Sequence, residues 1–125
     1  TESFPQIEAR CRAQADRLGA SLDFRQSNHE GELIDWVQAA RKDTDGLLIN
    51  GAGLTYTSIA LLDALLAYEK PIIEVHMSNI YKREPFRHHS FISKAATGIV
   101  AGLGPLGYEL AITAMVQLIE KVRQA

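Results

Sequence analysis

Apolar residues that recur every three or four positions predict four helices along the chain. Ser3 is a capping residue for the first of them, Pro5 fits its first turn, and Gly19 ends it. The others are predicted over residues 30–42, 57–69 and 106–123. The helix over 57–69 is apolar on more than one side, which is typical of a deeply buried helix or one at a subunit interface.

Short apolar runs between these helices predict strands over residues 47–49, 71–75 and 99–101, and alternating polarity predicts another over 21–25. Uninterrupted apolar strands are typical of a parallel sheet covered on both faces. Strands that alternate with helices therefore predict an α/β fold with a doubly wound parallel sheet. Such folds usually begin with a strand, whereas the first element here is a helix. We therefore expect residues 1–125 to form one domain that lacks its first strand.

The composition is ordinary for a soluble globular domain, with 46% apolar and 22% charged residues. The net charge of −2 gives no strong general attraction to nucleic acid or an anionic membrane, so neither is an expected partner. Cys11 is the only cysteine, which excludes an intrachain disulfide and a zinc–thiolate cluster and fits a reducing, cytoplasmic location. No apolar run approaches the roughly 20 residues that a membrane-spanning helix needs.

Polar residues cluster after three of the predicted strands, in the segments 26–32, 50–58 and 76–89. Ligands of open parallel sheets bind beyond the carboxyl ends of the strands, which meet at one edge of the sheet. The contrast between apolar strands and polar segments at that edge is the strongest residue-level indication of an active site.

His76 follows Glu74 by two residues at the end of a predicted buried strand. Residues at this spacing share one face of a strand, so the Glu74 carboxylate can orient the imidazole and favour its protonated form. A protonated histidine serves as a general acid near neutral pH. The alternative is a core histidine satisfied by ordinary hydrogen bonds, but Ser78, Asn79 and the nearby arginines favour a site.

Arg83 and Arg87 lie four residues apart and are suited to clamp a carboxylate or the hydroxyls of a polar ligand. The alternative is surface ion pairing with Glu84 or with another subunit. His88 and His89 are adjacent, so in an extended segment their side chains point to opposite faces and are poorly placed to share a metal. We expect no metal site in this chain.

Asn50 is followed by Gly51 and Gly53, which permit tight backbone geometry, and by a helix expected to start near Thr57. A helix N-terminus offers free N–H groups and a partial positive charge to an anion or a carbonyl oxygen. The alternative is a plain strand-to-helix turn capped by Thr57 or Ser58.

Several motifs of the chain, in this order, resemble the type II 3-dehydroquinate dehydratases. The matching segments are 24–35, 49–50, 53–55, 57–58, 60, 63–64, 73–76, 78–80, 83–84 and 86–90, with Gly98, Gly102, Gly104, Gly107 and Tyr108. They cover essentially the whole chain, and separate motifs at matching spacing make the resemblance highly specific.

The resemblance implies a flavodoxin-like fold and a dodecamer built from trimers. It implies a carbon–oxygen lyase that needs no metal or organic cofactor. The enzyme belongs to the shikimate pathway, which leads to the aromatic amino acids. The reaction is the anti elimination of water from 3-dehydroquinate, through an enolate, to give 3-dehydroshikimate. By this resemblance His76 protonates the departing hydroxyl, Glu74 orients His76, and Asn50 stabilises the enolate through a water.

The resemblance also assigns substrate contacts. Backbone N–H groups of Met77 and Ser78 hold the substrate carboxylate, while Tyr56, Arg87 and, from a neighbouring subunit, Asp63 contact its hydroxyls. Arg83 matches an arginine that supports a mobile lid and the charge around the catalytic base. These roles agree with elementary chemistry, because a developing enolate oxygen needs hydrogen-bond donors.

The family's opening strand, with its Asn-Gly-Pro-Asn-Leu-Asn segment, and its lid with the base tyrosine have no counterpart in the chain, and Thr1 falls where the family's first helix is entered. Tyr56, Tyr68, Tyr81 and Tyr108 do not match the lid tyrosine, and Tyr56 stands where histidine is commoner. Losing a positioned base typically lowers a rate by about 10²–10⁴-fold. On its own, the 125-residue chain is therefore expected to be a weak or inactive catalyst.

Three alternatives remain open from the residues alone. One is a lid-less, inactive binding module for dehydroquinate or a shikimate-like acid. A second is a flavodoxin-like nucleotide or flavin binder, although the chain has no Walker pattern and no complete G-x-G-x-x-G after a strand. A third is a purely structural oligomer subunit, for which the apolar helix around 59–66 is suited.

Overall fold

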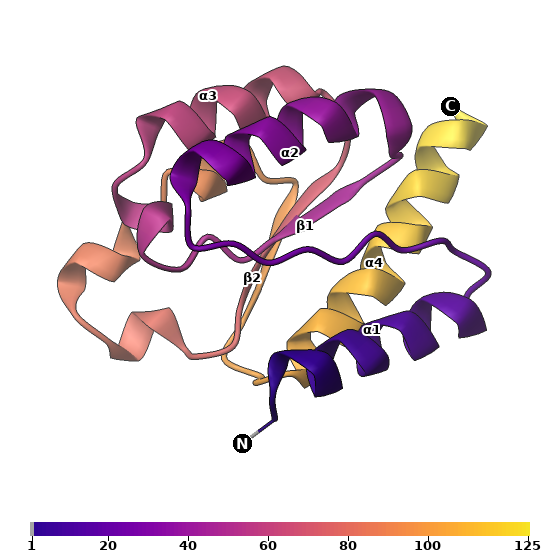
Figure 1. Cartoon of the computed structure of the whole chain (residues 1–125), viewed down its shortest axis with the longest axis horizontal. Helices are drawn as coiled ribbons and strands as arrows, with labels where there is room; N and C mark the ends of the chain where they lie inside the picture. Colours follow the sequence, from indigo (N-terminus) through magenta and orange to yellow (C-terminus); the bar gives the residue numbers. More distant parts are fainter. Residues whose placement is uncertain (1) are drawn as a thin grey trace.

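Three parallel strands, with two helices against each face, make up the core of the computed structural model, which describes residues 2–125. The strands are β1 (Leu47–Ile49), β2 (Ile72–His76) and β3 (Gly98–Ala101), in the order β1-β2-β3. The helices are α1 (Phe4–Arg17), α2 (Glu30–Asp43), α3 (Ile59–Tyr68) and α4 (Leu106–Gln124). Helices α1 and α4 cover one face of the sheet and α2 and α3 the other (Figure 1), so the predicted α/β architecture is confirmed. The expectation about Thr1 lies outside the described residues.

The first helix begins and ends where the sequence predicts. Ser3 Oγ accepts from Gln6 N at 3.3 Å, and Gln6 Oε1 accepts from Ser3 N at 2.7 Å, a reciprocal capping box. Gly19 follows the helix with φ of +72°, a conformation that costs glycine little. The helix buries Ile7, Cys11 and Ala15 against Ile112 of α4.

Strand β2 lies in the middle of the sheet, and all five of its residues are buried. Ile73 and Val75 pack against α4, whereas Ile72 belongs to the core between the sheet and helices α2 and α3. Because alternate residues of a strand face the same side, Glu74 and His76 share the side of Ile72. Two polar side chains therefore enter the α3 face of the sheet from its central strand.

The predicted strand over 21–25 is wrong as a strand, although its side chains alternate as expected. Leu22 and Phe24 are partly buried against the cluster around Ile7, while Ser21, Asp23 and Arg25 are exposed. Within residues 2–125 no strand pairs with this segment, and Leu22 O instead accepts from Arg12 Nη1 at 3.1 Å. Alternation needs only an extended, half-covered backbone, whereas a strand also needs a partner's backbone groups.

The remaining connections contain short 3₁₀ helices that the sequence does not predict. They are η1 (Ala52–Tyr56), η2 (Ile80–Lys82), η3 (Pro85–His88) and η4 (Ile92–Lys94). Three of them lie between β2 and β3 and fold this long segment beside the carboxyl end of the sheet, as the Phe91 N to Thr55 O hydrogen bond of 2.8 Å indicates. Within the described chain, no helix is both long and apolar enough to span a membrane.

Candidate active site

The carboxyl ends of β1 and β2 bring two of the predicted polar segments together. The parallel register pairs Ile49 with Glu74 and His76 with Ala101, so the residues that follow these strands meet at one edge. The third polar segment, 26–32, joins them through Glu30 at the start of α2. Its carboxylate accepts a hydrogen bond from Ser58 Oγ. The edge predicted from the sequence therefore exists as a structural unit.

His76 and Glu74 form a buried pair at this edge. His76 Nε2 lies 2.5 Å from Glu74 Oε2, and the two side chains are 5% and 0% exposed. Burial by itself would raise the pKa of the Glu74 carboxyl, but hydrogen bonds from His76, Ser93 and Ser90 outweigh it and hold that pKa below its ordinary value. An ionised Glu74 that bonds Nε2 fixes the ring orientation of His76, as an oriented proton donor requires.

One wall beside His76 is aromatic and cationic. The Tyr56 ring stacks on the His76 ring with centroids 6.3 Å apart and an interplanar angle of 20°. Phe86 meets Tyr56 edge-on at 6.1 Å, and the Arg87 guanidinium lies 5.3 Å from the centre of the Tyr56 ring. Tyr56 of η1 therefore contacts the imidazole, and Phe86 and Arg87 of η3 pack on Tyr56. Tyr56 and Arg87 are predicted substrate contacts.

The ion pair expected as an alternative role for the arginines is also present. Arg87 Nε donates to Glu84 Oε2 at 2.6 Å, and Arg83 Nε lies 3.9 Å from the same oxygen. Arg83 Nη1 also donates to Ser78 Oγ at 3.4 Å. Exposed ion pairs of this kind contribute little to stability, so the stacking of Arg87 on Tyr56 and the contact of Arg83 with Ser78 are better evidence for the roles of these arginines.

The Asn50 side chain is held in one orientation by two partners. Its Oδ1 accepts from Ala52 N at 3.1 Å, and its Nδ2 donates to Tyr108 Oη at 2.9 Å. Burial raises the pKa of the Tyr108 phenol, which therefore stays neutral near pH 7 and accepts this hydrogen bond. Within residues 2–125 the second N–H of the amide has no acceptor, so it is available to a ligand.

The backbone after Asn50 differs from the prediction. The helix expected near Thr57 is preceded by η1, and α3 begins only at Ile59, with Ser58 Oγ accepting from Leu61 N at 2.9 Å. The N-terminus of α3 therefore does not follow directly after Asn50, and Ser58 caps it, as the alternative interpretation of this segment expects. The difference arises because Asn50 and Gly51 start a tight 3₁₀ turn, closed by Leu54 N donating to Gly51 O at 3.0 Å.

Gly51 and Gly53 have different roles in this turn. Neither has a positive φ, and the residue with a positive φ here is Ala52, at +47°. We expect Gly51→Ala to destabilise the chain by about 1–3 kcal/mol through overpacking. The added Cβ would lie 2.4 Å from Ile92 Cδ1 and 2.7 Å from Thr55 Oγ1. Gly53→Ala is the matched control, because nothing lies within 4 Å of its Cβ position. Urea unfolding of both variants checks the prediction, and equal free energies of unfolding would contradict it.

Met77 and Ser78 place backbone amides at the end of β2. The carbonyls of His76 and Met77 accept from Gly102 N at 3.2 Å and from Gly104 N at 2.9 Å, which ties this turn to the one after β3. Within the described part of the chain, the N–H groups of Met77 and Ser78 have no acceptor. Two such donors side by side suit a carboxylate.

Asp63 is not brought to this edge. It lies exposed on α3, and among residues 2–125 it makes no hydrogen bond or ion pair with the other predicted site residues. This position is compatible with the predicted contribution to a neighbouring subunit's site, which a single chain does not test.

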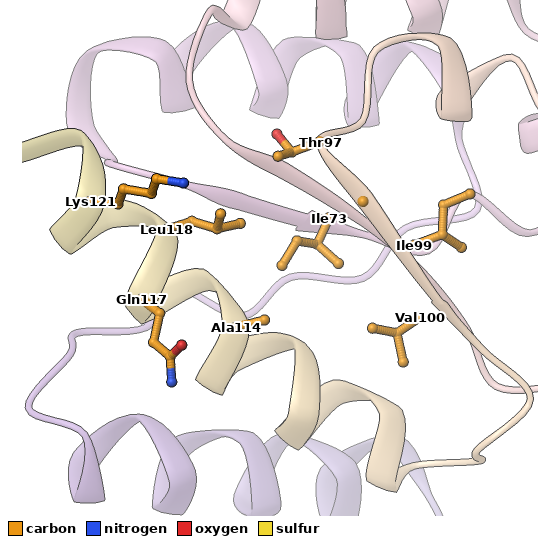
Figure 2. Close-up of a pocket in the computed structure, with 9 residues that line it drawn as sticks. Ile73, Thr97, Ile99, Val100, Ala114, Gln117, Leu118 and Lys121 are labelled. Atoms are coloured by element: carbon orange, nitrogen blue, oxygen red, sulfur yellow. The ribbon is translucent and has the colours of Figure 1, made fainter. Parts of the chain in front are cut away.

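Residues 2–125 contain no group of three or more His, Cys, Asp or Glu side chains arranged to hold a metal ion. A hollow of about 470 Å³ lies elsewhere, between β3 and the second half of α4. Figure 2 shows its lining, in which Ile73 of β2 and Val100 of β3 lie on the side of the sheet that faces Ala114 and Leu118 of α4. No predicted site residue lines it, so the candidate site is the open polar edge around His76.

Sequence reasoning missed three residues that contact this site. Ser90 and Ser93 donate to Glu74, and Tyr108 accepts from Asn50. Ser90 and Tyr108 belong to the segments that carry the resemblance, which is the one signal that the sequence offered for them.

Comparisons with known proteins give one consistent result. The family described as Dehydroquinase class II matches residues 1–116. A protein of Agrobacterium fabrum named 3-dehydroquinate dehydratase 2 is 51% identical over 120 residues, which are 96% of this chain and 82% of the relative. A protein of Aspergillus fumigatus named Catabolic 3-dehydroquinase 1 is 53% identical over 106 residues, or 85% of this chain and 71% of the relative.

Solved structures agree. The chain superposes on the type II dehydroquinase of Propionibacterium acnes with a TM-score of 0.89 and 40% identity, covering 94% of this chain and 86% of the other. A 3-dehydroquinate dehydratase-like protein of Bifidobacterium longum gives a TM-score of 0.78 at 28% identity, covering 94% and 89% of the two chains.

Proposed function

This chain belongs to the class II dehydroquinase family, and from that premise we propose that its single α/β domain dehydrates 3-dehydroquinate to 3-dehydroshikimate. The flavodoxin-like fold is shared with the type II dehydroquinases. The observation that carries the proposal is the buried contact of 2.5 Å between His76 Nε2 and Glu74 Oε2 at the carboxyl end of β2. The orientation of Asn50 at the end of the neighbouring strand supports it.

The reaction divides into two proton transfers. A base removes a proton from the carbon next to the ketone, and the electron pair of that C–H bond forms an enolate. The enolate then expels the hydroxyl on the β carbon as His76 donates a proton to it, so that water leaves and a conjugated ketone forms. Asn50 donates its remaining N–H toward the enolate oxygen, directly or through a water, and Glu74 keeps His76 oriented. No oxidant or organic cofactor is needed to balance these steps.

None of the four tyrosines is assigned as the base. Tyr68 and Tyr108 are held by Thr44 and Asn50, and burial raises the pKa of both phenols, which makes them harder to ionise. Tyr56 stacks against His76, on the side of the acid, whereas an anti elimination requires the base on the opposite face of the substrate.

Substrate recognition uses the rest of the edge. The backbone N–H groups of Met77 and Ser78 bind the carboxylate, and Tyr56 and Arg87 contact the hydroxyls. Arg83 supplies positive charge beside the catalytic base. The stacking of Arg87 on Tyr56 and the contact of Arg83 with Ser78 support these roles.

A second copy of the chain completes the site in this proposal. Asp63 reaches the substrate of a neighbouring subunit in a trimer, and trimers assemble into a dodecamer. Its exposure on α3, beside the exposed apolar side chains of Ile59 and Leu66, supports a packed interface there. Light scattering coupled to size exclusion tests the assembly. The buried, free thiol of Cys11 fits the cytoplasmic location that we propose for the enzyme.

The decisive experiment combines turnover with stereochemistry. The purified chain is incubated with 3-dehydroquinate, and formation of the conjugated ketone is followed by ultraviolet absorbance. Substrate deuterated on one face of the α carbon is then used, and mass spectrometry of the product shows which hydrogen is lost. Loss from the face opposite the departing hydroxyl is expected. Turnover is expected to be slow, because none of the chain's tyrosines is assigned as the base. Loss from the same face would refute the proposed reaction, and no conjugated product at all would favour the lid-less binding module.

A further inference from the structure

Glu74 carries a carboxylate with 0% side-chain exposure, and three groups hydrogen-bond to it. Its Oε2 contacts His76 Nε2 at 2.5 Å and accepts from Ser90 Oγ at 2.8 Å, while Oε1 accepts from Ser93 Oγ. Both oxygens are therefore engaged by protein donors. A buried charge is tolerated only with such partners, because an unsatisfied carboxylate carries a large desolvation penalty.

The two serines form a directed chain of hydrogen bonds that ends on Glu74. Ser93 N donates to Ser90 Oγ at 3.0 Å, which leaves the Ser90 hydroxyl proton for Oε2 of the carboxylate. In the described part of the chain the Ser93 hydroxyl has no backbone partner, and it donates to Glu74 Oε1. The segment between them is anchored by Ile92, which is 1% exposed, and by Phe91 N donating to Thr55 O at 2.8 Å.

Few other charged groups act on this carboxylate. Among residues 2–125, His76 is the one titratable side chain that hydrogen-bonds to it, and the neighbouring residues across the sheet are Ile49 of β1 and Ile99 of β3. From η1 the Tyr56 phenol stacks on His76, and from η3 the Arg87 guanidinium lies beyond Tyr56. Most of the support for an ionised Glu74 besides His76 therefore comes from the two hydroxyls.

We propose that Ser90 and Ser93 are positioning residues of the reaction, which hold Glu74 ionised and aimed at His76 so that His76 presents its proton to the departing hydroxyl. This inference rests on the proposed function, since it concerns the acid of that reaction. The serines touch neither the substrate nor the reacting atoms; they act through Glu74.

Ser93→Ala is the cleaner test of the two single variants, because Ser90 also accepts the Ser93 N–H and supports the local turn. We expect Ser93→Ala to lower kcat by about 10-fold, the effect of losing one hydrogen bond to a charged group, with KM nearly unchanged. We expect the double Ser90→Ala/Ser93→Ala variant to lower it further. Both serines are only partly buried, so alanine fits without strain.

The pH profile separates positioning from a structural role. Bonds to the ionised carboxyl lower the pKa of Glu74, so their stabilisation is present above the ordinary pKa and is lost as the pH falls through the folded-state value. Removing a donor raises that folded-state pKa. The acid limb of kcat should therefore move to higher pH in Ser93→Ala and further in the double variant.

Thr113→Val is the matched control, because it removes a partly buried hydroxyl that accepts from Gln14 of α1 and donates to Glu109 O within α4, on the opposite face of the sheet from Glu74. It should lower the melting temperature and leave the acid limb in place. In a Glu74→Gln background, Ser93→Ala should lower kcat little further, because the carboxylate through which Ser93 acts is already gone. An unchanged kcat and acid limb in the folded double variant, or an equal loss in the Glu74→Gln background, would overturn the inference.

A measurement without turnover keeps this test separate from the proposed function. Carbon-13 NMR follows the Glu74 carboxyl carbon through an acid titration, with Glu74→Gln used to assign its signal. A titration that moves to higher pH in Ser93→Ala supports the serines' role even in a chain that fails to dehydrate 3-dehydroquinate. An identical titration in both chains refutes that role whatever the activity.

Discussion

Replacing His76 with glutamine is expected to lower kcat by about 10²–10⁴-fold, the usual contribution of a positioned general acid. A glutamine amide can still reach Glu74 Oε2, but it has no proton to transfer to a departing hydroxyl. KM should change little, because the groups proposed to hold the substrate lie in the turn after β2 and on Tyr56 and Arg87. Steady-state kinetics with 3-dehydroquinate measure both constants.

His89→Gln is the matched control for this substitution. His89 is exposed and follows η3, so the same chemical change there removes an imidazole without touching the Glu74 pair. Its kcat should stay close to that of the unchanged chain. Circular dichroism of both variants separates loss of chemistry from loss of folding. A folded His76→Gln variant within tenfold of the original kcat would mean that another group protonates the hydroxyl.

The helices and apolar strands could be predicted because their signals are local. The ends of α1 are marked by Ser3, Pro5 and Gly19, which lie at or near them. The apolar residues of β2 are themselves the signal that this strand is buried. The segment 21–25 failed for the opposite reason. Its alternation was correct, but whether it becomes a strand depends on a backbone partner far away in the sequence, which alternation does not reveal.

The same distinction separates the parts of the site that were found from those that were missed. The pairing of Glu74 with His76 follows from a two-residue spacing in a strand, so the sequence predicted it. The contacts of Glu74 with Ser90 and Ser93 span 16 and 19 residues, and that of Asn50 with Tyr108 spans 58. Such contacts depend on the folding of the segment between β2 and β3 and on the packing of α4.

Together these contacts suggest a division of labour at the sheet edge. The carboxyl ends of β2 and β1 position His76 and Asn50, the residues proposed to act on the substrate. Later segments of the chain fix their orientation, through the serines that bond Glu74 and through Tyr108. Catalytic groups held in this way need little reorganisation during the reaction, which is the main source of electrostatic rate enhancement. The loss of kcat caused by a substitution should thus depend on whether it frees the side chain of His76 or that of Asn50.

Asn50→Asp is the sharpest test of this view at the enolate. Aspartate is nearly the same size, and its carboxylate can still accept from Ala52 N, so the turn should persist. It has no N–H for the enolate oxygen, and its negative charge opposes the charge that develops there. We expect kcat to fall by about 10²–10³-fold, as when one oxyanion donor is removed, and single-turnover kinetics will show whether the chemical step is slowed.

Asn79→Asp adds the same charge at the same end of the sheet without removing a proposed donor. Asn79 is exposed, and its Oδ1 accepts from Tyr81 N at 3.1 Å, a bond that a carboxylate can keep. Its effect on kcat should be small, because only the general field changes, and that field is screened by salt. Similar losses of kcat in the two variants would mean that charge at this edge, rather than the Asn50 donor, controls the enolate. A large loss confined to Asn50→Asp, insensitive to salt, would assign the enolate contact to the Asn50 amide.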